Sequence, residues 1–317
     1  MTPALFKERF DAVVDNIERV IKGKREVVRL VVTAVLADGH VLLEDLPGTG
    51  KTMLARSLAQ TISAPSSRIQ CTPDLLPADV TGTPIFELKT NEFRFREGPV
   101  FTNVLLVDEI NRATPKTQSA LLEAMQEGAV TMDGITHPLP KPFLMIATQN
   151  PIELAGTFPL PEAQLDRFLF KISLGYTGKE AEKAVLMANR LEEAIVRLEP
   201  VTSQAEIVEL AAWAREVALA EPVLDYIVDL CGATREDGSL LIGASTRASL
   251  AMMRAARVAA AAEGREDVYP EDVRRLLVPV WSHRLVLTPD AQLRDDTVEK
   301  VVERISARIK PPMGVGG

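Results

Sequence analysis

A short run of small, basic and hydroxyl residues near position 50 has the clearest chemical meaning in this sequence. Gly48, Gly50, Lys51 and Thr52 follow an apolar run and precede a helical pattern of apolar residues. Glycines allow successive backbone N–H groups to surround a phosphate, and the N-terminus of a helix favours an anion. The lysine adds positive charge for the β- and γ-phosphates, and the threonine hydroxyl can bind Mg²⁺. The pattern predicts a phosphate-binding loop between a strand and a helix.

The loop departs from the strict motif at one position. The strict form has a glycine five residues before Gly50, where this chain has Asp45. The alternative is a Pro-Gly turn that joins strand to helix and binds nothing. That alternative does not explain why Gly-Lys-Thr occupies the position where it would serve a phosphate. We therefore expect nucleotide contacts from the loop and the start of its helix, namely Pro47, Gly48, Thr49, Gly50, Lys51, Thr52 and Met53.

A pair of acidic residues follows a second apolar run. Residues 104–107 are Val-Leu-Leu-Val, and Asp108 and Glu109 come directly after them. Ligands bind at the carboxyl ends of strands in open α/β sheets, where a buried strand would present both carboxylates. Asp108 can hold Mg²⁺ through its water shell, while Glu109 can orient and deprotonate an attacking water. The alternative is an ordinary solvated strand end, and the phosphate loop upstream favours the catalytic interpretation.

Three further polar residues could act on a phosphate, although simpler explanations remain open. Asn150 follows a predicted buried strand, but Asn-Pro is also a turn signal. Arg167 precedes the last predicted strand, and Arg247 lies at the start of a predicted helix. Guanidinium groups stabilise the negative charge on phosphoryl oxygens during transfer. Each arginine could equally form a surface ion pair.

The composition limits the class of protein. The chain has 317 residues and a formal net charge of −8, which favours a two-domain globular protein and argues against nonspecific nucleic-acid binding. The charged N-terminal segment does not resemble a signal peptide, and no apolar run reaches the roughly 18 residues that span a membrane. Cys71 and Cys231 are predicted to be buried, reduced thiols of a cytoplasmic protein. The histidines lie far apart and predict no metal site.

The first block of predicted elements, residues 1–175, places the reactive residues at strand ends. Helices at 4–21 and 27–36 come first, and strands then alternate with helices. The predicted strands are residues 41–44, 68–71, 104–108, 143–148 and 170–174. This alternation predicts an α/β fold in which a parallel five-stranded sheet is sandwiched by helices.

The second block, residues 176–310, shows a helical pattern throughout. Thr177 with Glu180, and Ser203 with Glu206, have the spacing of capping boxes that begin two of its helices. We therefore expect a small all-α domain after the sheet. The tail at 311–317 is predicted to be disordered.

Two segments interrupt the alternation of the first block. Residues 72–103 are rich in Pro and Gly and contain two short strand patterns around Thr90 and Asn91. Residues 129–138 alternate apolar and polar types around Asp133-Gly134, which is a strong hairpin signal. Each segment could project from the domain or only extend an edge of the sheet.

Long stretches of the first block resemble one known family. They include Leu-Pro-Gly-Thr-Gly-Lys-Thr at 46–52 and Asp-Glu-Ile-Asn-Arg-Ala at 108–113. The other matching stretches are residues 74–82, 98–101, 115–118, 122–127, 148–151 and 158–168. The chain is similar to the MoxR family of AAA+ ATPases, within the clade that has a helix-2 insert and a pre-sensor hairpin. Residues 72–103 correspond to that insert, 129–138 to the hairpin, and the helical block to the lid.

The resemblance implies roles for the residues of the predicted phosphate loop and of the strand ends beside it. It assigns Lys51 and Thr52 to the Walker A motif, and Asp108 and Glu109 to the Walker B motif, with Mg²⁺ on Thr52 and Asp108. Asn150 corresponds to sensor 1. The Glu-Asp before the loop is usual in MoxR relatives, so the missing glycine does not count against the assignment.

The resemblance also implies two arginine roles and an adenine-side segment. Arg167 corresponds to the arginine finger, which acts on the ATP of the neighbouring subunit. Arg247 corresponds to sensor 2, which is expected to act within its own subunit. Ile21 to Gly23 lie where the family contacts adenine, although the motif is degenerate here.

The implied function is a ring-forming, Mg²⁺-dependent ATPase, expected to be hexameric, that remodels or matures partner proteins. The family often acts on a von Willebrand factor A domain protein or on metal insertion. A magnesium-chelatase-type motor subunit shares most of these motifs and stays open. A DNA-acting motor or transcription activator is disfavoured by the acidic charge and by the absence of a Gly-Ala-Phe-Thr-Gly-Ala loop. A nucleotide-gated scaffold with little hydrolysis is a third alternative.

Overall fold

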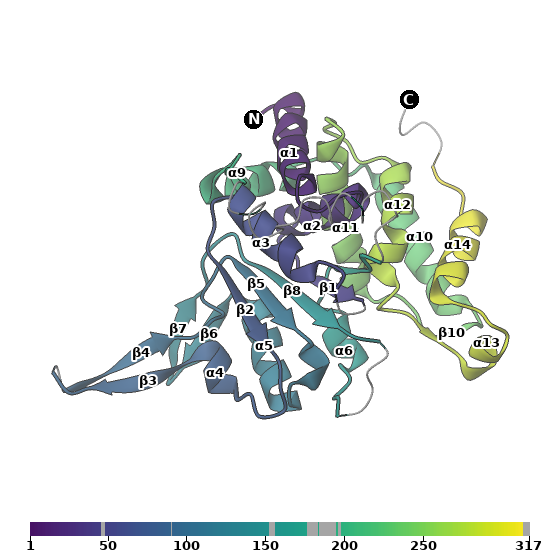
Figure 1. The fold of residues 1–317 in the computed structure, drawn as a ribbon. Helices are drawn as coiled ribbons and strands as arrows, with labels where there is room; N and C mark the ends of the chain where they lie inside the picture. Colours follow the sequence, from purple (N-terminus) through teal and green to yellow (C-terminus); the bar gives the residue numbers. More distant parts are fainter. Residues whose placement is uncertain are drawn as a thin grey trace.

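A parallel sheet of five strands forms the centre of the molecule (Figure 1). The structure, a computed structural model, describes residues 1–45, 48–89, 91–151, 156–175, 183, 195 and 198–312. The strand order is β2-β5-β8-β1-β9, and every neighbouring pair is parallel. The strands are β1 (Val41–Glu44), β2 (Ser66–Gln70), β5 (Val104–Asp108), β8 (Leu144–Gln149) and β9 (Phe170–Ile172). The predicted parallel α/β sheet is confirmed.

Both faces of the sheet are buried, because its side chains alternate between two hydrophobic clusters. In β5, Val104 and Leu106 belong to one cluster, whereas Leu105 and Val107 belong to the other. The first cluster includes residues of α1 (Pro3–Glu18), α2 (Arg25–Leu36) and α3 (Lys51–Thr61). The second includes residues of α4 (Pro77–Thr81) and α5 (Pro115–Glu127). Burial on both faces explains why β1, β5 and β8 contain apolar runs, whereas the edge strand β2 is polar and mostly exposed.

The C-terminal part contains mainly helices. They are α9 (Gln204–Arg215), α10 (Glu221–Glu236), α11 (Thr246–Ala262), α12 (Pro270–Trp281), α13 (Pro289–Leu293) and α14 (Val298–Arg308). Ser203 caps α9 by accepting a hydrogen bond from the backbone N–H of Glu206 at 3.2 Å, as predicted. The predicted cap at Thr177 and Glu180 lies outside the described residues.

The expectation of helices throughout this part was wrong at two short segments. β10 (Leu240–Ile242) and β11 (Val286–Leu287) form an antiparallel pair. Strands of two and three residues are too short to show a period of two, so no sequence pattern indicates them. The predicted domain limits at 175 and 176 remain a prediction.

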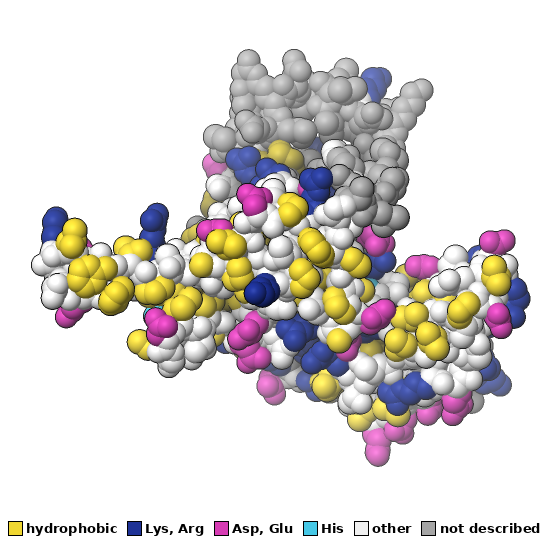
Figure 2. Space-filling model, turned by 90° about the horizontal axis from the view of Figure 1, so that it is seen from below, with side chains coloured by type: hydrophobic (Ala, Val, Ile, Leu, Met, Phe, Trp, Pro, Cys, Tyr) yellow, Lys and Arg dark blue, Asp and Glu magenta, His cyan; other side chains and the backbone are white. Residues whose placement is uncertain are grey.

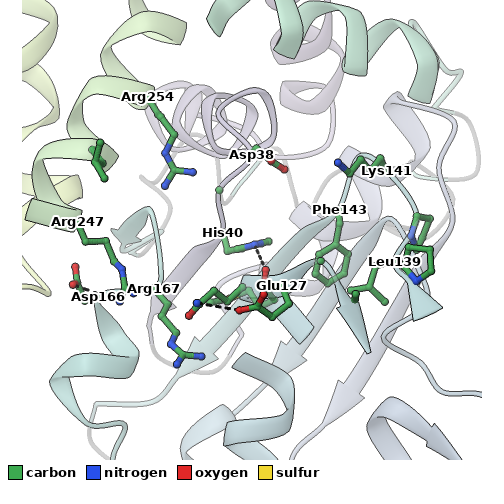
Figure 3. A pocket seen from close by; sticks show the side chains of 18 of the residues that line it. Asp38, His40, Glu127, Leu139, Lys141, Phe143, Asp166, Arg167, Arg247 and Arg254 are labelled. Carbon is green, nitrogen blue, oxygen red and sulfur yellow. Dashed lines mark hydrogen bonds and ion pairs between the residues drawn. The ribbon is translucent and has the colours of Figure 1, made fainter. Parts of the chain in front are cut away.

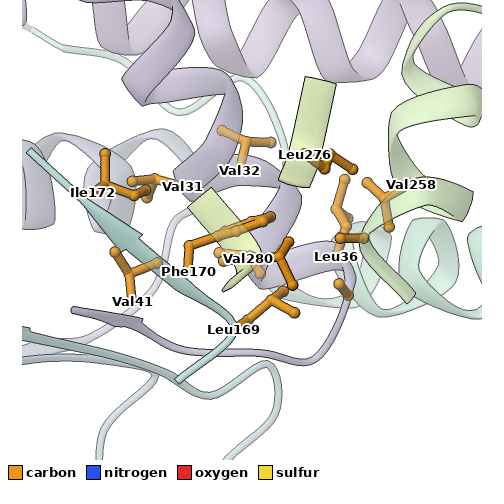
Figure 4. Packing of buried hydrophobic residues seen from close by; sticks show 14 of the residues in the cluster. Val31, Val32, Leu36, Val41, Leu169, Phe170, Ile172, Val258, Leu276 and Val280 are labelled. Carbon is orange, nitrogen blue, oxygen red and sulfur yellow. The ribbon is translucent and has the colours of Figure 1, made fainter. Parts of the chain in front are cut away.

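One hydrophobic cluster joins the sheet to the C-terminal helices (Figure 4). Val32 of α2 and Phe170 of β9 pack in the same cluster as Val258 of α11 and Val280 of α12. Val32, Phe170, Val258 and Val280 are each at most 1% exposed. The two parts therefore share a core, and α11 and α12 lie against the same side of the sheet as α2.

Two β-hairpins extend from the other end of the sheet (Figure 1). The longer one pairs β3 (Gly82–Glu87) with β4 (Glu92–Glu97) within the predicted insert. The shorter one pairs β6 (Ala129–Met132) with β7 (Ile135–Pro138), and Asp133 and Gly134 form its turn at φ +50° and +79°. Both predicted hairpins are therefore present, and the longer one projects from the body of the molecule.

The long hairpin carries exposed apolar side chains along its length (Figure 2). Phe93 is 74% exposed and Leu88 is 87% exposed, while Phe86 and Phe93 meet edge to face with ring centroids 5.2 Å apart. Phe95, nearer the root, stacks on His137 of the short hairpin with centroids 4.3 Å apart. The two hairpins are therefore in direct contact.

The root of the long hairpin requires glycine. A Cβ atom on Gly98 would lie 2.3 Å from the carbonyl oxygen of Val80, and one on Gly82 would lie 2.3 Å from the carbonyl oxygen of Arg96. Both distances are shorter than van der Waals contact allows, so a side chain at either position would displace backbone. Among the described residues, no helix is long and apolar enough to span a membrane.

Candidate active site

The phosphate-binding loop lies between β1 and α3, as predicted. Gly48 and Gly50 have φ values of +83° and +91°, in the left-handed region that glycine tolerates best. A Cβ atom at either position would meet nothing within 4 Å, so the backbone conformation rather than crowding favours glycine. Gly50 is the N-cap of α3, and Lys51 and Thr52 form its first turn. Pro47, which was expected to join this loop, lies outside the described residues.

Asp45 fixes the start of the loop in a way that the sequence did not reveal. Its side chain is buried and accepts hydrogen bonds from the Ser173 hydroxyl at 2.9 Å and the Gly175 N–H at 2.9 Å. It also accepts one from the backbone N–H of Leu174. The carbonyl oxygen of Asp45 accepts a hydrogen bond from Lys51 Nζ at 3.0 Å. Asp45 therefore ties the end of β1 to the end of β9, a task that a glycine could not perform.

The remaining residues of the predicted nucleotide site lie around this loop. Thr49 and Thr52 are partly exposed in the loop and helix, and Met53 packs against the hydrophobic cluster beneath them. Ile21 is buried in the turn after α1, and Gly23 has a φ of +69° in the same connection. Lys24 Nζ lies 4.0 Å from the point where a Cβ atom on Gly175 would lie. Gly175 follows β9 and donates its N–H to Asp45, so the connection after α1 lies close to the end of β9. The predicted adenine-side segment is thus near the loop.

The acid pair lies at the C-terminal end of β5, beside the neighbouring strand β8. The Thr148 hydroxyl donates to Asp108 Oδ1 at 2.8 Å and accepts from the Glu109 N–H at 2.9 Å. Thr148 is fully buried, so one hydroxyl holds both acidic residues. Glu109 has a φ of +55°, a strained conformation for a residue with a side chain. Asn150 follows β8 and lies at the same edge of the sheet.

Side chains from two neighbouring elements contact the two carboxylates. Arg68 of β2 donates to Asp108 Oδ2 at 2.7 Å, and Gln70 donates to Glu109 Oε2 at 3.0 Å. Arg112 also donates to Glu109 Oε2, at 3.2 Å. Sequence reasoning missed Arg68, Gln70 and Thr148 because a contact between strands depends on their register. The register pairs Gln70 with Asp108.

Arg167 and Arg247 lie at the N-terminal ends of the parallel strands, opposite the phosphate loop and the acid pair. We call this end of the sheet the arginine edge, and the end with Lys51, Asp108 and Glu109 the loop edge. Arg167 comes before the start of β9, and its guanidinium donates to the carbonyl oxygen of Leu122 in α5 at 3.1 Å. Arg247 lies in the first turn of α11, where its guanidinium is 3.8 Å from Asp166 Oδ2. β1 separates this edge from the phosphate loop by roughly 13 Å, since four residues rise about 3.3 Å each. The structure brings the two arginines together but not with the loop.

These arginines line a cleft of about 750 Å³ between the sheet and α11 (Figure 3). Arg254, two turns after Arg247 on α11, and Lys141 add further positive charge to its wall. His40 forms part of the floor, where its Nε2 contacts the carbonyl oxygen of Met125 at 3.0 Å. Burial lowers the pKa of His40 to about 4. The basic side chains outnumber the carboxylates of Asp38, Glu127 and Asp166 in the wall of this cleft.

The expected action of Arg247 within its own subunit stays a prediction, and the structure describes only where the side chain lies. Its guanidinium lies beside Asp166 at the arginine edge, whereas its own phosphate loop begins beyond the far end of β1. The sequence motif identified the residue, but the side on which the lid packs decides which nucleotide the residue can reach. No sequence signal reported that side.

The described residues contain no group of three or more His, Cys, Asp or Glu side chains that could hold a metal ion by themselves. A single carboxylate with a threonine hydroxyl and phosphate oxygens is the usual donor set for Mg²⁺ beside a nucleotide. Asp108, oriented by Thr148, and Thr52 at the start of α3 fit that set. Cys71 and Cys231 are buried and free, as predicted, and burial raises the pKa of Cys71 to about 12.

Comparison with known families places both parts of the chain. Residues 40–170 match the profile of the ATPase family associated with various cellular activities (AAA), and residues 232–305 match that of the AAA lid domain. A structure of a putative ATPase from Cytophaga hutchinsonii superimposes with a TM-score of 0.91 and 36% sequence identity, over 98% of this chain and 97% of that one.

Three curated relatives cover nearly the whole chain. The uncharacterized protein YeaC of Bacillus subtilis is 47% identical over 95% of this chain and 94% of its own. The chaperone MoxR1 of Mycobacterium tuberculosis is 42% identical over 94% of this chain and 81% of its own. Protein MoxR of Paracoccus denitrificans is 33% identical over 92% of this chain and 93% of its own. The expected resemblance is confirmed, and this chain belongs to the MoxR family of AAA+ ATPases.

Proposed function

We propose that this protein hydrolyses ATP in the presence of Mg²⁺ at sites shared between neighbouring subunits of a cytoplasmic ring, with six subunits as the expected number. The observation that carries the proposal is the separation of two incomplete half-sites on opposite edges of one sheet. The loop edge holds Lys51 and the acid pair, and the arginine edge holds Arg167 and Arg247. A single subunit cannot bring these groups together, but two copies placed edge to edge can.

At the loop edge, the chain's own groups bind and orient the substrate. Backbone N–H groups around Gly48 and Gly50 surround the phosphates, and Lys51 neutralises their charge. Thr52 and Asp108 would hold Mg²⁺, which when bound withdraws charge from the β- and γ-phosphates. Residues 1–175 form the catalytic unit in this proposal.

Glu109 is the proposed base for the attacking water. Its carboxylate is held by Gln70 and Arg112, and its backbone by Thr148. Both side chains donate to Oε2, so Oε1 is the oxygen proposed to accept the proton of the water. Asn150, at the end of the adjacent strand, is placed to orient the same water or the γ-phosphate.

At the arginine edge, Arg167 and Arg247 reach the ATP of the next subunit. Negative charge spreads over the γ-phosphoryl oxygens during transfer, and an arginine supplied in trans accelerates such reactions by about 10³–10⁵-fold. The cleft wall beside α11 would then be one side of the subunit interface. Residues 176–310 act as the lid, and their rotation with the nucleotide state would change the arginine edge.

The work done on partners is proposed from the relatives and from the hairpins. One relative is named a chaperone, and the long hairpin exposes Phe93 and Leu88 where they can contact a client protein. Hairpins that move with nucleotide state could remodel that client. A protein with a von Willebrand factor A domain, matured or loaded with a metal, is the partner that the family resemblance favours.

The test is to mix two inactive variants. Lys51→Ala should abolish ATP binding, while Arg167→Ala should bind ATP and hydrolyse it on the order of 10³-fold more slowly. Mixed rings contain interfaces where an intact loop meets an intact arginine, so the mixture should recover activity that neither variant has alone. Arg294→Ala, on an exposed turn of the lid, is the matched control and should keep full activity.

Two results would contradict the proposal. One is unchanged specific activity when the protein is diluted to isolated subunits. The other is a lack of recovery in rings shown by mass spectrometry to contain both variants.

A further inference from the structure

A buried arginine of the lid is bonded to the short segment that carries Arg167. Arg284 lies between α12 and β11, and its side chain is 2% exposed. It reaches the segment between α6 (Glu162–Leu165) and β9, which is 115–118 residues away in sequence. Arg167 is in the middle of that segment. The lid therefore touches the backbone on both sides of Arg167.

All five N–H donors of the Arg284 guanidinium are used, four of them for residues 166–169 and one for Val280 of the preceding helix α12. Nε donates to Asp166 Oδ1 at 2.7 Å. The other four bonds go to backbone carbonyl oxygens, those of Asp166, Phe168, Leu169 and Val280. A planar fork with every donor engaged fixes position and orientation together, which a lysine could not do. The neighbouring His283 contacts the carbonyl oxygen of Phe168 at 2.9 Å, from the same lid turn.

Asp166 links this contact to the start of α11. One carboxylate oxygen accepts from Arg284, and the other accepts from the Ser245 hydroxyl at 3.1 Å. Ser245 is the N-cap of α11, and Arg247 is two residues further, 3.8 Å from the same oxygen. A single carboxylate thus holds two separate turns of the lid against the segment of Arg167. Figure 3 shows Asp166 beside Arg247 and Arg167.

The Arg284 guanidinium keeps its charge at neutral pH. Burial lowers the pKa of Arg284 to about 10, and the hydrogen bond that Arg284 donates to Asp166 opposes that shift. The guanidinium therefore stays protonated under ordinary conditions, and its five bonds remain.

We propose that Asp166 and Arg284 are positioning residues, which hold Arg167 in the orientation that reaches the neighbour's ATP and make that orientation depend on the lid of the same subunit. The inference rests on the proposed trans function of Arg167. A rigid lid–segment contact means that a lid rotation caused by one subunit's nucleotide moves the arginine presented to the next subunit. The contact is therefore a route by which one site controls another.

The first measurement uses Asp166→Asn and Arg284→Lys. Both variants keep a polar group of similar size, but they remove the charged pair or the five-donor fork. We expect ATP affinity to stay close to that of the wild type, because the phosphate loop is untouched. Turnover in assembled rings should fall by about tenfold to a hundredfold, since a misplaced catalytic group can cost that much.

Glu263→Gln is the matched control. Glu263 also forms an ion pair between the lid and the sheet unit, with Arg29 at 2.7 Å, but it does not contact residues 166–169. It should leave turnover unchanged. A loss equal to that of Asp166→Asn would show that any lid contact matters and would overturn the inference.

Mixed rings separate positioning from a general structural defect. Asp166→Asn subunits keep an intact loop, so Lys51→Ala subunits, which keep a correctly held Arg167, should restore their turnover. Arg167→Ala subunits should not restore it, because neither partner then presents a working arginine. If Asp166→Asn lowers the melting temperature below the assay temperature, Arg284→Lys carries the same test.

The outcomes also distinguish this inference from the proposed function. Recovery of Arg167→Ala by Lys51→Ala, without recovery of Asp166→Asn or Arg284→Lys, would overturn the positioning role alone. Failure of Arg167→Ala itself to recover would overturn the shared site, and with it this inference.

Discussion

The two edges of the parallel sheet hold their reactive residues in different ways. At the loop edge, Asp108 and Glu109 are held by residues of the sheet unit itself, chiefly Thr148 and Gln70. At the arginine edge, the segment of Arg167 is held by Arg284 of the lid. The side chains of the loop edge are therefore held by contacts within the sheet unit alone, whereas the segment of Arg167 depends on how the lid packs against that unit. This difference suggests that nucleotide binding is local and that turnover is controlled by the lid.

The largest expected effect tests the loop edge. Glu109→Gln removes the proposed base but keeps an acceptor for Gln70, so ATP should still bind while turnover falls by about 10²–10⁴-fold. Binding is measured with a fluorescent nucleotide and turnover by phosphate release. Glu209→Gln, exposed on α9, is the control. Turnover within a few-fold of the wild type would remove Glu109 from the mechanism.

A second variant tests which subunit Arg247 serves. Arg247→Ala should lower turnover by about 10²-fold, the usual cost of losing one group that stabilises developing charge. Because Arg247 lies at the arginine edge, Lys51→Ala subunits should restore the activity in mixed rings. Absence of recovery, while Arg167→Ala recovers, would mean that Arg247 acts on its own subunit's ATP.

His40 provides a pH test at the arginine edge. Its Nδ1 accepts from the Met145 N–H at 3.1 Å, so protonation would break a buried hydrogen bond. Burial lowers its pKa from 6.5 to about 4, and the unfolded chain therefore binds the proton first as pH falls. The stabilising contribution is full above pH 6.5 and is lost towards pH 4, by on the order of 3 kcal/mol.

Urea unfolding at pH 7 and pH 5 measures this loss. His40→Gln should reduce the difference between the two pH values, even if the variant is less stable at both. An unchanged difference would assign the pH dependence to other groups, such as His283, whose pKa burial also lowers.

The smallest expected effect concerns Asp45 at the loop edge. Asp45→Asn keeps the shape but weakens the bonds to the Ser173 hydroxyl and the Gly175 N–H, so stability should fall by about 1–3 kcal/mol. ATP affinity should fall as well, because the loop starts at this residue. Thermal melting and nucleotide titration measure the two losses. An effect on melting alone would show that Asp45 supports the sheet without shaping the loop.

The sequence predicted the loop edge well because its residues are close together in the chain or follow apolar strands. Gly50 and Lys51 are adjacent, and the strand before Asp108 has the continuous apolar pattern of a sheet buried on both faces. Local sequence patterns report such features directly. The two hairpins were also predicted, since turn residues such as Asp133 and Gly134 specify them locally.

The sequence could not predict the contacts that hold these residues. Thr148 meets Asp108 through strand pairing, and Arg284 meets Asp166 across 118 residues of chain. Neither contact has a local pattern, and each depends on the register or packing of elements that are distant in sequence. For the same reason the motif around Arg247 gives no information on its ion pair with Asp166.

The glycines at the root of the long hairpin have a practical consequence. Because backbone approaches Gly82 and Gly98 too closely for any side chain, the base of the hairpin accepts no substitution without a shift of the main chain. New recognition sequences should therefore be grafted away from the root of the hairpin, with Gly82 and Gly98 kept unchanged.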